Sequence, residues 1–224
     1  MTNSRMHISL AALALLVPVA AAQADLYSYT ELGLTGPGTV RSTLADKGQL
    51  AGSLAMGLTE ENTAQLFFEK GSVITGSDLA LTQGGSVPVG TAVNSYILHF
   101  DPVGASSSPV YEFHGTLTFE EKVLGVIFDT DAVHGAMAAS DASLGLGSGY
   151  YDANYRYRKF EEQAKWGDVA ILGSHSVTLN LFTNSAMDEV RIITTPVPGA
   201  ALLGTLGLGL SGYLCRRRKL AHLS

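Results

Sequence analysis

Short runs of apolar and polar residues, separated by turn-forming residues, recur through the middle of the chain. The clearest run is residues 93–100, which is rich in β-branched and aromatic side chains and stops at Asp101-Pro102. Residues 176–182 alternate between apolar and polar side chains, as a strand with one buried face does. Further strands are predicted at residues 26–30, 64–74, 115–119, 123–128 and 189–194, with a hairpin connection at residues 120–122.

Helical spacing of apolar side chains occurs in only two places in this region. These are residues 44–56, where glycines weaken the pattern, and residues 155–166. Many short strands with little helix predict an all-β fold. We expect an antiparallel β-sandwich of the jelly-roll type over residues 25–194, with one or two short helices.

The first 24 residues have the pattern of a secretory signal peptide. Arg5 precedes an apolar run at residues 8–22, and Ala22-Gln23-Ala24 offers a small-x-small cleavage site. We therefore predict cleavage after Ala24 and export through the Sec translocon. A permanent N-terminal membrane helix is the less favoured alternative, because the run is short.

Residues 195–219 form a second apolar segment with different flanks. Residues 197–215 carry no charged side chain. As a helix they would extend about 28 Å, close to the roughly 30 Å apolar core of a bilayer. The basic cluster at residues 216–219 would stay in the cytoplasm with the short end 220–224. The pattern predicts a single transmembrane helix, and an ordinary membrane anchor is the simplest alternative.

This tail resembles the PEP-CTERM sorting signal of Gram-negative bacteria, which an exosortase recognises. The residues that carry the resemblance are Pro196, Val197, Pro198 and Gly199 before the Gly/Leu-rich run, and Arg216, Arg217 and Arg218 after it. The Glu of the Pro-Glu-Pro form is absent, because Val197 stands between the two prolines. The resemblance covers about the last tenth of the chain and implies no activity for the rest. It implies anchoring in the inner membrane, removal of the tail by the exosortase, and a final location at the cell surface or outside the cell.

The charge between the two apolar ends limits the partners of the chain. Residues 25–195 hold nine basic and all twenty acidic side chains, a net charge of −11. This surface repels phosphate backbones, so nucleic-acid binding is not expected. The only cysteine, Cys215, lies in the tail, which excludes a disulfide, a thiol nucleophile and Cys-ligated zinc from this segment.

Calcium is the only metal that the sequence suggests, and no other cofactor is predicted. Asp129 and Asp131, followed by Asp141, could supply some of the several oxygen ligands that Ca²⁺ needs. The spacing is not that of an EF-hand, and such residues also commonly end a strand and solvate a turn.

A tyrosine-rich stretch is the candidate carbohydrate contact. Tyr150, Tyr151, Tyr155 and Tyr157 lie among Asp, Asn and Arg residues, and tyrosine rings pack on the flat apolar faces of sugars while their hydroxyls form hydrogen bonds. The alternative is that the tyrosines anchor a long loop against the sandwich.

Two classes of function follow from these observations. The export signals, the acidic body and the lack of a nucleophile-elbow motif favour a non-enzymatic cell-surface or extracellular-matrix protein associated with exopolysaccharide. The alternatives are a secreted carbohydrate-active hydrolase, with acids from the regions of Glu112, Asp129 or Asp168, and a calcium-dependent carbohydrate-binding module. A cleft lined by two carboxylates and aromatic rings would favour the hydrolase.

Overall fold

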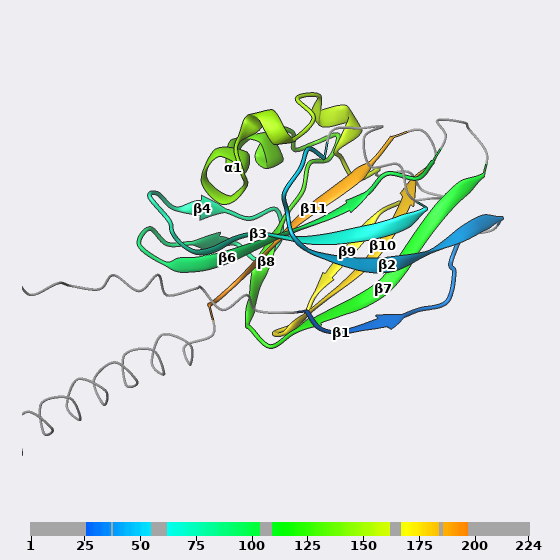
Figure 1. The fold of residues 1–224 in the computed structure, drawn as a ribbon, viewed down its shortest axis with the longest axis horizontal. Helices are drawn as coiled ribbons and strands as arrows, with labels where there is room; N and C mark the ends of the chain where they lie inside the picture. Colours follow the sequence, from blue (N-terminus) through cyan, green and yellow to red (C-terminus); the bar gives the residue numbers. More distant parts are fainter. Residues whose placement is uncertain are drawn as a thin grey trace, which may run out of the picture.

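The computed structural model describes residues 26–36, 38–54, 62–103, 109–161, 167–183 and 186–196. These residues contain eleven strands and little helix, which confirms the mostly β fold expected from the sequence (Figure 1). The predicted signal peptide and residues 197–224 of the predicted tail lie outside them. Within the described ranges, no helix has the length and apolar character needed to cross a bilayer.

Nine strands form one mixed sheet, whose first and last strands approach each other. Its order is β8 (Val123–Ile127), β11 (Asp188–Thr194), β6 (Ala92–Phe100), β3 (Thr63–Ile74), β2 (Thr39–Gln49), β7 (Val110–Phe119), β10 (Ser176–Thr183) and β9 (Val169–Leu172). The ninth strand, β1 (Leu26–Glu31), pairs with β7. The N–H of Val123 in β8 donates to the carbonyl of Ser174, just after β9, at 2.9 Å, so the sheet is nearly closed at this point.

Strand β2 joins the two halves of the sheet. It pairs in parallel with β7 from Thr39 and in parallel with β3 from Thr43, whereas the other strand pairings in the described ranges are antiparallel. The expectation of a wholly antiparallel sandwich is therefore wrong at this strand. The helix predicted for residues 44–56 is also wrong, because residues 44–49 belong to β2. Strand pairing there overrides a weak helical pattern, and Gly48 adopts a φ of 66° that a helix does not contain.

The hairpin predicted around residues 120–122 does not form. Strand β8 pairs with β11, whereas β7 pairs with β1, β2 and β10. The turn instead carries the chain from one half of the sheet to the other. The N–H of Phe119 supports this crossing by donating to the carbonyl of His175 at 2.8 Å.

Alternation of side chains gives the central strands two buried faces. Leu98 and Ile192 belong to the main apolar core, which the two halves of the sheet enclose. Ile97 points the other way and belongs to a second apolar cluster with Met137 of α1 (Ala136–Leu144), the helix that covers the outer face (Figure 1). Every residue of β11 is consequently buried.

The free edge of β8 is covered by the loop of a small hairpin formed by β4 (Leu79–Ala80) and β5 (Ser86–Val87). The N–H groups of Thr82 and Gln83 donate to the carbonyl of Val126 at 2.9 and 3.2 Å. The loop can approach this edge of β8 closely because Gly125 has no side chain.

Replacing Gly125 with alanine is expected to lower the free energy of unfolding by about 1–3 kcal/mol, the usual cost of overpacking. The added methyl carbon would lie 2.3 Å from the backbone oxygen of Gln83, so the covering loop would have to move. Chemical denaturation of the purified full-length chain measures this effect. Gly33→Ala is the control, since no atom lies within 4 Å of its added carbon. Equal denaturation midpoints for the two variants would contradict the close approach.

Candidate functional site

A network of charged side chains is buried between the outer face of the sheet and α1. None of its members is more than 2 % exposed. They are Glu69 of β3, Glu189 and Arg191 of β11, Asp141 of α1, and Arg158. The alternation that sends Val190 and Ile192 into the main core sends Glu189 and Arg191 to this outer layer.

Each arginine of the network binds two carboxylates. Arg191 donates from Nε and Nη2 to the two oxygens of Glu69 at 2.7 and 2.9 Å, and Nη2 also lies 2.9 Å from Asp141. Arg158 binds both oxygens of Asp141, at 2.8 and 3.0 Å, and its Nε donates to Glu189. Asp141 therefore bridges the two arginines, and α1 is held to the sheet by charge-assisted hydrogen bonds.

Tyr151 and His99 complete this network. The Tyr151 hydroxyl donates to Glu69 at 2.5 Å, and the guanidinium carbons of Arg158 and Arg191 lie 5.0 and 5.4 Å from the centre of its ring. His99 Nδ1 lies 2.9 Å from Glu189. Burial acts to raise the pKa of Glu189, but Arg158 and His99 outweigh it, so this pKa is lowered. The network is closed and paired internally, which identifies it as structural.

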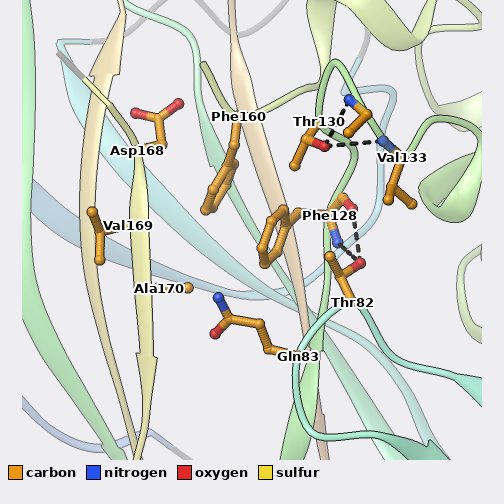
Figure 2. A pocket seen from close by; sticks show the side chains of 10 residues that line it. Thr82, Gln83, Phe128, Thr130, Val133, Phe160, Asp168, Val169 and Ala170 are labelled. Atoms are coloured by element: carbon orange, nitrogen blue, oxygen red, sulfur yellow. Dashed lines mark hydrogen bonds between the residues drawn. The ribbon is translucent and has the colours of Figure 1, made fainter. Parts of the chain in front are cut away.

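An open hollow of about 370 Å³ lies where β8 and β9 diverge. Figure 2 shows Phe128 and Phe160 across this gap; their rings stack with centroids 4.2 Å apart. The rings form a floor, since Phe128 is 6 % and Phe160 is 2 % exposed. Thr82 and Gln83 lie on one side of the hollow, and Asp168 lies on the other (Figure 2).

Asp168 connects the hollow to a cluster of three carboxyl groups, which we call the acidic cluster. Its members are Glu161, Asp168 and Asp188, and one oxygen of each lies within 4.8 Å of the others. Asp168 accepts hydrogen bonds from the N–H groups of Phe182, at 2.7 Å, and Glu161, at 2.6 Å. Asp188 is 0 % exposed, and neither of its side-chain oxygens accepts a hydrogen bond from an N–H or hydroxyl group in the described ranges.

The pKa values of all three carboxyl groups in the acidic cluster are raised. Burial raises the pKa of Asp188 well above its usual value, and the charges of Asp168 and Glu161 add to this shift, while Lys159 opposes it. Burial also raises the pKa values of Asp168 and Glu161. A hydrogen bond between the Glu161 and Asp188 carboxyls requires a proton on one of them. The cluster is therefore suited to bind either a proton or another cation.

The three predicted calcium ligands have three different partners. Asp129 accepts hydrogen bonds from the N–H groups that begin α1, Ala136 at 2.7 Å and Met137 at 3.2 Å, and so caps this helix. Asp131 pairs with Lys159 at 2.6 Å, and Asp141 belongs to the arginine network. The structure does not bring these carboxylates together into one site.

The predicted tyrosine contact is divided between surface and interior. Tyr150 is 41 % exposed and Tyr157 is 36 % exposed, at the ends of 3₁₀ turns Ser148–Tyr150 and Tyr155–Tyr157. Tyr151 is 5 % exposed and is held by Glu69, so it is not available to a sugar. The side chain of Tyr155 lies outside the described residues.

The other predicted positions differ in how much of them the structure describes. The helix predicted over residues 155–166 is replaced by the second of these turns, and residues 158–161 are not helical. Residues 162–166 are outside the described ranges. Of the sorting motif, Pro196 is described, directly after β11, whereas Val197, Pro198, Gly199 and the arginine cluster are not.

The acids considered for hydrolysis also separate. Glu112 accepts hydrogen bonds from Thr35, Gly36 and Thr39, and these donors lower its pKa although burial acts to raise it. Asp129 caps α1, and Asp168 alone of the three lines the hollow. The cleft with two carboxylates that would favour a hydrolase is therefore not formed by these three residues.

Two members of the acidic cluster were missed from the sequence. Asp188 begins a strand and Glu161 lies in an irregular segment, and neither position matched a motif. The available signal was an acid at the start of a strand rich in β-branched residues, where burial is expected. Comparison with protein-family models, curated proteins and solved structures found no match for this chain. Its function is therefore argued from its own residues.

Replacing Arg191 with methionine is expected to lower the free energy of unfolding by about 3–5 kcal/mol, because Glu69 and Asp141 would stay buried without their partner. Chemical denaturation of the full-length chain measures the loss. Arg41→Met is the matched control, since Arg41 forms an exposed pair with Glu31, and its loss should cost less than about 1 kcal/mol. Similar losses for both variants would contradict the role assigned to the buried network.

Asp188→Asn is expected to flatten the dependence of stability on pH when divalent cations are removed by a chelator. The folded-state pKa of Asp188 is raised. Its contribution to stability is therefore full below the unfolded-state pKa, about 3.9, and is lost as the pH rises through the folded-state pKa. The stability of the variant relative to the wild type should therefore rise as the pH increases above about 4, as urea denaturation would show.

Asp46→Asn, at an exposed position, is the control for this measurement. Parallel stability curves for the wild type and Asp188→Asn would show that Asp188 does not titrate as described.

Proposed function

We propose that this protein is an exported, non-enzymatic component of the cell surface or extracellular matrix, sorted by an exosortase and associated with exopolysaccharide. The observation that carries the proposal is the position of the sorting motif relative to the folded body. Strand β11 is flanked by β8 and β6 and is fully buried, and Pro196 follows it after a single residue.

This position makes the tail separable from the body. The N–H of Thr195 donates to the carbonyl of Lys122 at 2.9 Å, and in the described ranges this is the last backbone hydrogen bond along the chain. Cleavage at or after the Pro196–Gly199 motif would leave every described strand in place. An exported domain that an enzyme releases from its anchor needs this arrangement.

The interior of the body supports a binding or structural role over catalysis. Its two facing halves enclose an apolar core, and β2 joins them along one side. This arrangement supports the proposal of a jelly-roll-like sandwich. Buried carboxylates such as Glu69 and Glu112 are held by several donors each. A glycosidase needs two carboxyl groups facing each other across a substrate, roughly 5–10 Å apart.

A calcium-dependent carbohydrate-binding module is the second candidate. The observation that favours it is the open hollow of about 370 Å³ beside Asp168, in an acidic domain with two exposed tyrosines nearby in the sequence. The two candidate functions are compatible, because a surface protein that binds exopolysaccharide through such a module would fulfil both.

Expression with and without an exosortase tests the proposal. The surface fraction from the host with the enzyme should contain a product whose intact mass lacks the tail, and this product should co-sediment with exopolysaccharide. Changing the arginines 216–218 to glutamine should abolish trimming, because the basic cluster sets the orientation of the tail. Changing the exposed Arg156 to glutamine is the control.

A mass that always includes residues 200–224 would contradict sorting and leave a permanent anchor. Trimming without co-sedimentation would contradict only the association with exopolysaccharide.

A further inference from the structure

We propose that Glu161, Asp168 and Asp188 form a binding site for a divalent cation of the calcium type, at the end of the enclosed core beside the hollow. One carboxylate oxygen from each residue lies within 4.8 Å of the others. Two oxygens bound to one Ca²⁺ at about 2.4 Å can be up to about 5 Å apart, so the spacing fits a shared ion.

The strongest argument is the state of Asp188. It lies on the core-facing side of β11, it is 0 % exposed, and no N–H or hydroxyl group among the residues that the structure describes donates to either carboxylate oxygen. Its side chain forms a hydrogen bond with the carboxyl of Glu161, a member of the same cluster. Buried carboxylates are ordinarily paired, hydrogen-bonded or bound to a metal, because an unmatched buried charge is costly. Its polar neighbours in the cluster are two further carboxyls, which cannot supply a matching positive charge.

Glu121, on the turn after β7, shows how this chain matches a buried carboxylate when no ion is needed. Glu121 is 2 % exposed and accepts hydrogen bonds from Asn94 at 2.5 Å and Tyr96 at 3.3 Å, as well as from the hydroxyl of Thr194. Asn94 and Thr194 lie at one end of the paired strands β6 and β11, and Asp188 lies at the other end of β11. Two buried carboxylates are thus associated with opposite ends of one strand pair, and in the described ranges only Glu121 has amide or hydroxyl donors.

The charge near the acidic cluster also favours a cation. Lys159 influences the protonation of all three carboxyls, but its ammonium lies 2.6 Å from Asp131, an exposed fourth acid. Among the described residues, these four carboxyls in their deprotonated forms and one ammonium leave an excess of negative charge, which a divalent ion would reduce.

The donor set selects the class of ion. All three ligands are carboxylate oxygens, which suit hard cations such as Ca²⁺ and Mg²⁺, whereas zinc sites use nitrogen or sulfur. The N–H groups of Phe182 and Glu161 fix the orientation of Asp168, and each of its oxygens keeps a free lone pair for an ion. Asp168 lines the hollow, which gives an ion and its water ligands a route to the cluster. Mg²⁺ requires near-octahedral geometry and dehydrates reluctantly, whereas Ca²⁺ accepts irregular oxygen coordination, so a buried set of carboxylates favours calcium.

Calorimetric titration of the full-length chain with CaCl₂, after treatment with a chelator, tests the proposal. The expected result is one ion bound per chain, with a rise in the thermal midpoint as Ca²⁺ is added. Asp188→Asn and Glu161→Gln should each weaken binding at least tenfold. Asp46→Asn, an exposed acid that bonds the N–H of Gly48, should bind calcium as the wild type does.

Each outcome decides the proposal. Glu161 is only partly buried, so Glu161→Gln keeps the test valid if Asp188→Asn does not fold, as circular dichroism would show. No binding to the wild type at millimolar calcium, or unchanged affinity in a folded variant of the cluster, would overturn the site. Tighter binding of MgCl₂ than of CaCl₂ would overturn the assignment to calcium.

Discussion

The pairing of Arg158 and Arg191 with three buried acids is the constraint on which the outer layer depends. Its members come from β3, β11, α1 and the segment after α1, so the network forms only when all four are in place. Apolar contacts alone would tolerate a shifted helix, whereas two arginines that each bind both oxygens of one acid and one oxygen of another do not. We expect that the main effect of the network is to fix the position of α1 on the sheet, and that its net contribution to stability is smaller.

The distribution of buried charge gives the molecule two unlike regions. In the outer layer each arginine faces more than one acid, and Asp141 is shared between them. In the acidic cluster beside the hollow, three acids converge, and Asp188 has no N–H or hydroxyl donor within the described ranges. The first arrangement is complete by itself and the second is completed by a proton or an ion. A ligand site is therefore more plausible at the second, although the first holds more charges.

Sequence patterns predicted those strands whose own residues form a recognisable run of apolar and β-branched side chains. Strands β6, β10 and β11 lie where the apolar and β-branched runs placed them. Strand β2 was missed because its residues are mostly exposed and it is fixed by partners far along the chain. Helix α1 was missed because it is built of alanine and serine with little separation of apolar and polar faces, and its start is set by the distant carboxylate of Asp129.

The candidate site was less accessible from the sequence, because its members are brought together by pairing. Asp168 precedes β9 and Asp188 begins β11, and they approach each other only after the sheet has curved. Acids that are close in sequence, such as Asp129 and Asp131, gave a stronger prediction of a metal site. In the structure, however, these two acids bind different partners.

The parallel pairing of β2 also has a consequence for how the chain reaches this fold. Val40 is paired with Tyr111, so the first residues of β2 gain their strand partner in the described part of the sheet only after about half of the chain has been made. Contacts between residues so far apart in sequence slow folding, since a long loop must close before any of them forms. Slow folding of this kind would suit the proposed export, because a chain must still be unfolded when it is threaded through a narrow pore.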